Sequence, residues 1–190
     1  MEEKKKYLAL VNLDSLKDLQ KELAESVDVN DLTDDKLVHG GDPYERNSHI
    51  TLLFGMPRLP SKDCCSTLEN SEKISLKALE VKAFERRNIV FKEGGSHSYD
   101  VLYVELEVPE NLLEMRKMLI ADTDAKPDLE FKPHMTIGFL KPGKAQKYSK
   151  VLKSETAILE EIVFREWQKA DDLLVLRLEP KEKSVKKQKV

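Results

Sequence analysis

Short apolar runs, several of them alternating with polar residues, recur along this chain with the spacing typical of β-strands. The first run, residues 7–13 (YLALVNL), predicts a buried strand. The same pattern predicts further strands at 48–55, 74–84, 88–92, 100–108, 131–140, 157–168 and 173–178. None of these runs is long enough for a transmembrane helix, so we expect no membrane span.

Segments with a helical period separate some of these strands. After Asp14 or Ser15, either of which can cap a helix, a stripe of leucines predicts a helix that ends near Ser26. Pro109 is favoured at the start of a helix and predicts a second one that ends near Ala121. Two shorter helices are expected at 64–71 and 144–152.

The predicted elements repeat coarsely along the chain. Each half contains a strand, a helix and a second strand in which a histidine is followed two residues later by a threonine. His49 and His134 therefore lie about half the chain apart. The arrangement predicts one α+β domain over residues 1–180, with two antiparallel sheet-plus-helix lobes around a central cleft. Residues 181–190 contain five lysines and few apolar residues, which predicts a disordered tail.

Composition and charge narrow this picture in two ways. The net charge is −3 although 35% of the residues are charged, so a phosphate-binding site must be a local basic patch. The only cysteines, Cys64 and Cys65, are adjacent and cannot readily bridge each other, which favours reduced thiols in a cytoplasmic protein. The N-terminal residues lead into the first strand without the apolar core of a signal peptide.

The two His-x-Thr strands carry the strongest chemical signal. Because side chains alternate along a strand, His49 and Thr51 point to one face, and His134 and Thr136 do the same in the second half. On the opposite, buried face of the first of these strands we expect three apolar residues: Ile50, Leu52 and Phe54. Two such strands, one in each lobe, would direct two imidazoles and two hydroxyls into one cleft.

This set of side chains suits the cleavage of a phosphodiester. An imidazole has an ordinary pKa of about 6.5, so one histidine can deprotonate the attacking hydroxyl while the other protonates the leaving oxygen. Threonine hydroxyls can donate hydrogen bonds to the non-bridging phosphate oxygens as negative charge builds up on them. We therefore expect four catalytic residues and neither a metal nor a cofactor: His49, Thr51, His134 and Thr136.

Zinc binding by the two motif histidines is the alternative interpretation. It lacks a carboxylate or thiolate at a suitable spacing as the third ligand. The remaining histidines, His39 and His97, lie in predicted polar loops, and we interpret them as exposed residues. Acid–base catalysis is therefore the preferred interpretation of the two motifs.

The strings at 49–52 (HITL) and 134–137 (HMTI) resemble the paired signatures of the two-histidine (2H) phosphoesterase superfamily, the LigT-like proteins. That superfamily includes RNA 2′,3′-cyclic phosphodiesterases and 2′-5′ RNA ligase-like proteins. The resemblance extends over residues 7–178. It implies the bilobed α+β fold and the acid–base roles of the two histidines.

Longer strings at 49–55 (HITLLFG) and 133–143 (PHMTIGFLKPG) are similar to the phage anti-CBASS branch, whose enzymes cleave cyclic oligonucleotide messengers of bacterial defence. That branch also has a glutamate and a tryptophan on the strand after the second motif, here Glu161 and Trp167, and a tyrosine in its first strand, here Tyr7. The resemblance implies a 3′-5′-linked cyclic di- or oligonucleotide substrate, and the host cytoplasm if the protein is phage-encoded. The alternatives are an RNA end-processing enzyme and a non-catalytic nucleotide sponge.

Five side chains are candidates for substrate binding: Tyr7, Lys132, Lys141, Glu161 and Trp167. Lys132 has the same strand parity as His134, and Lys141 follows the second motif strand. Either lysine could contact phosphate, as could Lys144, but ordinary surface lysines would fit these positions equally well. Trp167 could stack on a base or pack in the core. No feature of the sequence specifies an oligomeric state.

Overall fold

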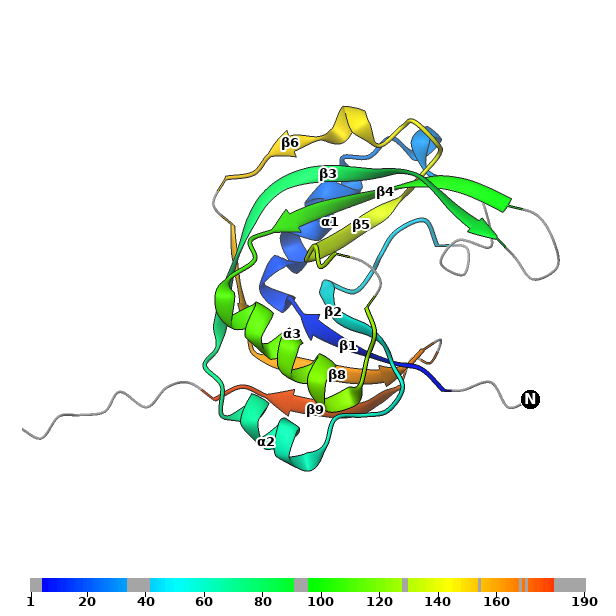
Figure 1. The fold of residues 1–190 in the computed structure, drawn as a ribbon. Helices are drawn as coiled ribbons and strands as arrows, with labels where there is room; N and C mark the ends of the chain where they lie inside the picture. The colour runs from blue at the N-terminus through cyan, green and yellow to red at the C-terminus, as the bar shows by residue number, and fades with distance from the viewer. Residues whose placement is uncertain are drawn as a thin grey trace, which may run out of the picture.

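The computed structural model describes residues 5–33, 42–90, 96–127, 130–153, 155–167, 169 and 171–179, with only the backbone described at 86–90 and 96–97. Two antiparallel sheets face each other across the molecule (Figure 1). This confirms the predicted α+β class with two sheets. The lysine-rich segment 181–190 lies outside the described residues, and the domain limits stay a prediction.

The first sheet has the strand order β2-β1-β8-β9. Its strands match predicted ones and have these bounds: β2 (His49–Met56), β1 (Tyr7–Asn12), β8 (Glu161–Glu166) and β9 (Asp172–Arg177). The segment 157–168, predicted as one strand, is instead two strands, β7 (Thr156–Leu159) and β8. The chain changes sheets at Glu160, because β7 pairs with β3 of the second sheet while β8 pairs with β1.

The second sheet has the strand order β5-β4-β3-β6. Its strands have these bounds: β5 (His134–Leu140), β4 (Ser96–Leu106), β3 (Ile74–Val90) and β6 (Lys150–Val151). The prediction of separate strands at 74–84 and 88–92 was wrong, because β3 is continuous. A register shift between Phe84 and Arg87 interrupts the apolar alternation in the sequence, but pairing with β4 resumes beyond it.

Three helices complete the structure within the described residues: α1 (Lys17–Glu25), α2 (Lys62–Glu69) and α3 (Glu110–Thr123). A 3-10 turn, η1 (Asp14–Leu16), precedes α1. The helix predicted at 144–152 is wrong: only the 3-10 turn η4 (Gln146–Tyr148) forms there. The chain then extends into β6, because hydrogen bonding to the edge of β3 outweighs a weak helical pattern. None of the helices in the described part of the chain could span a membrane.

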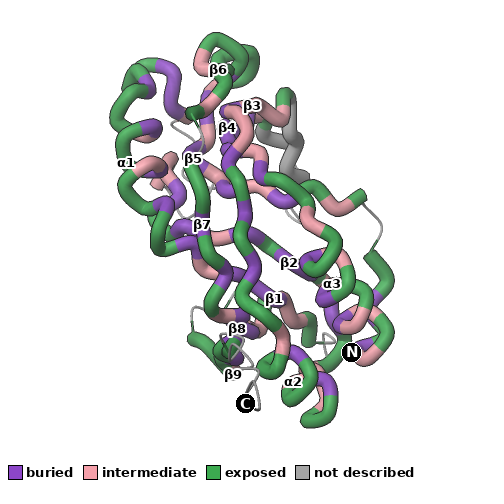
Figure 2. Tube along the Cα trace, turned by 90° about the vertical axis from the view of Figure 1, so that its left-hand side faces the viewer, coloured by how far each residue is buried: buried purple, intermediate pink, exposed green. Residues whose placement is uncertain are grey.

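The two halves of the chain exchange their helices. Helix α1 connects β1 to β2 of the first sheet but packs against β5 of the second. Helix α3 connects β4 to β5 of the second sheet but packs against β2 of the first (Figure 1). The buried residues form a continuous cluster that runs through both lobes (Figure 2). Each lobe is therefore built from both halves of the sequence.

Candidate active site

His49 is the first residue of β2 and lies opposite Asn12 of β1. Its Nδ1 lies 2.9 Å from the carbonyl oxygen of Asn47. Because a carbonyl oxygen can only accept, Nδ1 must carry the proton of this hydrogen bond. The neutral ring then has its lone pair on Nε2, and the protonated ring has an acidic N–H there. His49 can therefore exchange a proton with a ligand through Nε2.

His134 repeats this geometry at the start of β5. Its Nδ1 lies 2.7 Å from the carbonyl oxygen of Lys132, again two residues earlier in the chain. The same argument fixes the proton on Nδ1 and leaves Nε2 for chemistry. Both imidazoles are half-buried, so each ring is held by protein while one edge can reach solvent or a ligand. The two histidines thus have the same tautomer for the same local reason.

A β-bulge follows each His-x-Thr motif. In β2 the pairing with β1 moves from Thr51 to Leu53 and skips Leu52. In β5 the pairing with β4 moves from Thr136 to Gly138 and skips Ile137. A bulge bends its strand and shifts the alternation of side chains by one residue. Each threonine therefore lies immediately before a kink in its strand.

The bulge in β2 overturns one expectation about the buried face. We expected Phe54 to be buried with Ile50 and Leu52, but its side chain is 42% exposed. Both Leu52 and Leu53 are buried instead, so the residues after the bulge have the opposite parity. Phe54 therefore points to the same face as Thr51.

On that face the ring of Phe54 meets the ring of Trp167, at a centroid distance of 4.2 Å and with the rings edge to face. Trp167 follows β8, and its backbone N–H donates to the carbonyl oxygen of Lys6 at 2.8 Å. Its side chain is 40% exposed, so it is not a core residue. The two rings form an exposed aromatic pair beyond the motif threonine, at the end of β2 away from His49.

Gln20 of α1 connects the two motif strands. Its Nε2 donates to the carbonyl oxygen of Thr136 at 2.7 Å, and its Oε1 accepts from the hydroxyl of Ser48 at 2.6 Å. Both Gln20 and Ser48 are buried. One side-chain amide therefore joins the residue before His49 to the threonine of the other motif.

The segment before β2 provides a second connection. The carbonyl of Pro43 accepts from the N–H of Phe139 at 2.7 Å, and the N–H of Glu45 donates to the carbonyl of Ile137 at 3.2 Å. The chain thus runs along the free edge of β5 and enters β2 four residues after Glu45, which limits the separation of Glu45 and His49 to about 14 Å. The strands β2 and β5 consequently lie side by side (Figure 1).

Arg116 of α3 makes a third connection, which parallels that of Gln20. Its Nε donates to the carbonyl oxygen of Leu52, the bulged residue of β2, at 3.1 Å. Its guanidinium also lies over the ring of Phe131, just before β5, at 4.8 Å from the ring centroid. Burial lowers the pKa of Arg116. Helix α1, from the first half of the chain, thus contacts β5 near its bulge, and α3, from the second half, contacts β2 near its bulge.

Aromatic rings surround His134 on the second sheet. The rings of Phe84 and Tyr103 stack on each other at 4.0 Å, and both meet the imidazole edge to face, at 5.0 and 5.3 Å. Glu105 lies opposite His134 in the pairing of β4 and β5 and binds Lys82 at 2.6 Å. This hydrogen bond is the main reason that the pKa of Lys82 is raised.

The structure places two of the predicted substrate-binding residues on the face of His49. Trp167 is one of them. The other is Glu161, which the register of β1 and β8 puts beside Asn12, two strands or about 10 Å from His49. Glu161 accepts from Nε of Arg177 at 3.0 Å. Tyr7 shares the opposite face of β1 with buried Ala9, so its side chain packs on the core side.

The two lysines predicted to bind substrate, Lys132 and Lys141, lie near opposite ends of β5. Lys132 supplies the carbonyl that accepts from His134, while its ammonium contacts Glu130 at 3.2 Å. Lys141 follows the far end of β5, about 24 Å along the strand from His134. Its ammonium donates to the carbonyl oxygen of Asn30 at 3.2 Å. The structure therefore does not bring Lys141 to the histidines.

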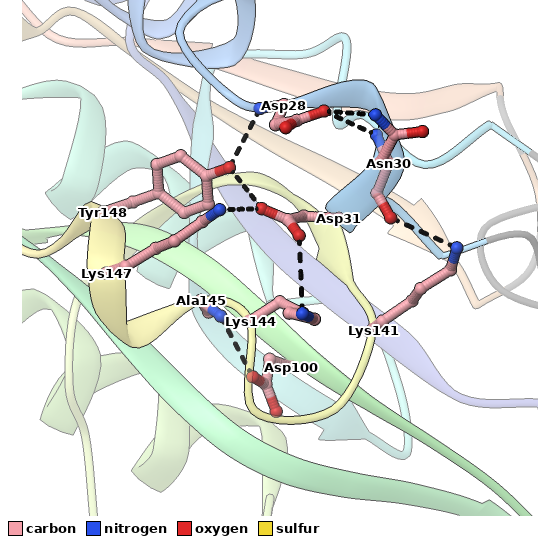
Figure 3. A network of polar contacts seen from close by, with 9 residues as sticks. All are labelled: Asp28, Asn30, Asp31, Asp100, Lys141, Lys144, Ala145, Lys147 and Tyr148. Carbon is pink, nitrogen blue, oxygen red and sulfur yellow. Dashed lines mark hydrogen bonds and ion pairs between the residues drawn. The ribbon is translucent and has the colours of Figure 1, made fainter.

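Lys141 belongs to a separate polar network centred on Asp31 (Figure 3). The buried carboxylate of Asp31 contacts Lys147, accepts from the hydroxyl of Tyr148 at 2.6 Å, and lies 3.9 Å from the ammonium of Lys144. The hydrogen bond from Lys147 contributes most to lowering the pKa of Asp31. This network joins the segment 28–31 to the turn after β5 and explains the positions of three lysines.

The described residues contain no cluster of three or more histidine, cysteine, aspartate or glutamate side chains that could bind a metal ion. The sequence did not single out Gln20 or Arg116 as candidates. Gln20 did leave a signal, since a polar residue interrupts the leucine-rich face of its helix. Arg116 left none, because its significance depends on a contact with a distant segment, the carbonyl oxygen of Leu52.

No protein-family model matches the chain, and a search of curated proteins gave no match. Solved structures do match. A protein described as a phosphoesterase and Escherichia coli LigT in complex with 3′-AMP each give a TM-score of 0.53 at 15% identity, over 93% of this chain and 99% of theirs. LigT in its apo form gives 0.51 at 14% identity, over 92% of this chain and 97% of its own. The chain therefore has a LigT-like fold.

Proposed function

We propose that this protein is a metal-independent phosphodiesterase that uses His49 and His134 as its acid–base pair. One observation carries the proposal: both imidazoles have Nδ1 fixed by a backbone carbonyl, on strands that Gln20 joins. This arrangement leaves two Nε2 atoms for proton transfer. Thr51 and Thr136, which share the faces of the two histidines, supply hydroxyl donors for the phosphate oxygens.

A 3′-5′-linked cyclic oligonucleotide is the substrate that we propose first. Its neighbouring 2′-hydroxyl attacks phosphorus while one histidine accepts the hydroxyl proton. The bond from phosphorus to the 5′-oxygen breaks, the other histidine protonates that oxygen, and a 2′,3′-cyclic phosphate forms. The same pair can then activate water, which opens the cyclic phosphate to a monoester. No electrons are transferred to or from an external partner.

Three observations support a nucleotide as the substrate. The exposed aromatic pair of Phe54 and Trp167 offers a surface on which a base can stack. E. coli LigT, which shares the fold, has been solved with 3′-AMP. The strings at 49–55 and 133–143, together with Glu161 and Trp167, are similar to the anti-CBASS branch and favour the cyclic substrate.

A panel of substrates, incubated with the protein in EDTA and analysed by product chromatography, tests this proposal. We expect turnover of cyclic dinucleotides by the wild type and loss of turnover in His49→Ala and His134→Ala, both of which should remain folded by circular dichroism. Activity within tenfold of the wild type in either variant contradicts the acid–base pair. Inhibition by EDTA contradicts a metal-independent reaction.

An RNA 2′,3′-cyclic phosphodiesterase is the second candidate, favoured by the fold shared with LigT. Such an enzyme would catalyse only the second step, the opening of a cyclic phosphate at an RNA end. RNA oligonucleotides that end in a 2′,3′-cyclic phosphate belong in the same panel. Their turnover without that of cyclic dinucleotides would identify this function, whereas tight binding without any turnover would identify a nucleotide sponge.

A further inference from the structure

A small polar pocket of about 130 Å³ opens beside His49. Besides His49, its walls include Asn12 from the end of β1, Lys17 from the start of α1 and Arg165 from β8. Pockets that enclose a whole drug-sized ligand measure about 300–1,000 Å³. This pocket therefore suits a small charged group of a ligand rather than a base with its sugar.

The pocket lies on the same face of the first sheet as the proposed catalytic residues. Asn12 pairs directly with His49, so their side chains share a face. Leu8 pairs with Phe54 on one side and with Arg165 on the other, which puts Arg165 on that face as well. Trp167, two residues further along the chain, has the same parity. Arg165 therefore lies on the face of the sheet that carries both the aromatic pair and His49.

Two cations line this pocket, and each is held by an acidic partner, one of which, Asp14, lines the pocket as well. Nε of Arg165 donates to Asp172 at 2.5 Å, and the ammonium of Lys17 contacts Asp14 at 2.5 Å. A guanidinium has five N–H donors and an ammonium has three, so both groups can still donate to a ligand. The ion pairs orient the two cations, and the amide of Asn12 adds a neutral donor.

We propose that this pocket is a second anion subsite, which binds the phosphate next to the one that is cleaved. The proposal rests on the proposed function, because it takes His49 as the position of the scissile phosphate. Arginine and lysine are the side chains that recognise phosphate by charge-assisted hydrogen bonds. The subsite selects substrates with at least two phosphate groups over a single nucleotide monoester or cyclic monophosphate.

Equilibrium binding tests the subsite without requiring turnover. The probes are 3′-AMP and adenosine 3′,5′-bisphosphate, which differ by one phosphate group, measured by calorimetry at fixed ionic strength. We expect the wild type to bind the bisphosphate about tenfold more tightly, the effect of one well-formed charge-assisted contact. Lys17→Gln and Arg165→Gln should each lose most of this preference, while Arg165→Lys should retain part of it.

Lys21→Gln is the matched control, because Lys21 is also an exposed lysine of α1 beside an acidic residue but does not line the pocket. It should keep the full preference. An unchanged preference in both Lys17→Gln and Arg165→Gln, or equal binding of the two probes by the wild type, overturns the subsite. If the binding preference depends on these residues but no nucleotide is cleaved, the subsite stands and the proposed function fails.

Discussion

Gln20 and Thr136, which lie 116 positions apart, are joined by a hydrogen bond of 2.7 Å from the Gln20 amide to the Thr136 carbonyl. Because the same amide accepts from Ser48, it fixes the relative position of β2 and β5 at the point where each motif lies. The hydrogen bonds that set the two imidazole tautomers are local, but one of the contacts that relate the two motif strands to each other comes from a helix. Gln20 is thus a positioning residue in the proposed reaction.

Gln20→Leu should reduce both stability and turnover. The substitution preserves the approximate size of the side chain but leaves the Thr136 carbonyl and the Ser48 hydroxyl without their partner. We expect a loss of about 1–3 kcal/mol in the free energy of unfolding, measured with urea. We also expect kcat to fall by about tenfold or more with a smaller change in KM, because the relative position of the two strands that carry the imidazoles contributes to the rate of the proposed chemical step. Lys21→Gln on the same helix is the control, and a normal kcat in Gln20→Leu would remove the positioning role.

Gly138→Ala should destabilise the contact between β5 and the segment that leads into β2. A Cβ at this position would lie 2.9 Å from the carbonyl oxygen of Pro43, which is backbone and cannot move freely. We expect a loss of about 1–3 kcal/mol of unfolding free energy together with reduced activity. Gly143→Ala offers a comparison, because its cost of about 1–2 kcal/mol comes from its positive φ of 76° and not from crowding. That variant should lose stability but keep its activity.

Trp167→Ala should weaken substrate binding with little effect on the fold. A base stacked on an aromatic side chain contributes about 1–3 kcal/mol, so we expect KM to rise by about tenfold while kcat stays within twofold. The ring is 40% exposed, so the unfolding free energy should change little. Trp167→Phe preserves an aromatic surface and should recover most of the affinity. As this is the only tryptophan, quenching of its fluorescence by nucleotide gives a direct binding measurement in the wild type. Failure of nucleotide to change this fluorescence would contradict stacking.

Asp31 should make the stability of the protein depend on pH. Its pKa is lowered below the ordinary 3.8, chiefly by the hydrogen bond from Lys147. A carboxyl group with a lowered folded-state pKa contributes stability that is complete above its unfolded pKa and is lost as pH falls through the folded value. Asp31→Asn should therefore be less stable than the wild type at pH 7, and this gap should shrink below about pH 3.8. Asp18→Asn, an exposed carboxylate of α1, should show no comparable gap in urea unfolding at either pH.

The sequence was sufficient to predict the strands that carry the motifs and the face shared by each histidine and its threonine, because these depend only on alternation within one segment. The sequence was not sufficient to predict that the side chain of Phe54 is exposed. The bulge at Leu52 depends on the register with β1, and an apolar residue looks the same in sequence on either side of such a bulge. The exposed aromatic pair was missed for that reason.

Contacts between distant segments account for the other differences. The helix expected at 144–152 does not form, because residues 150–151 pair with the edge of β3 instead. The local propensity of the segment does not encode this pairing. Arg116 appeared to be an ordinary charged residue of a helix, and its role became visible only when its carbonyl acceptor at Leu52 was known. The exchange of α1 and α3 between the sheets likewise requires the whole chain, since each helix fits its own half equally well by periodicity.

The exchange of α1 and α3 between the sheets has a consequence for truncation and partial unfolding of the protein. A fragment that ends between the two halves would have a sheet without the helix that covers it, so an apolar surface would face water. Neither half can then serve as an independent unit, and partial unfolding of one lobe uncovers the other. The two imidazoles should accordingly separate in the same cooperative step in which the core unfolds. The distance between them therefore depends on the folding of the whole chain.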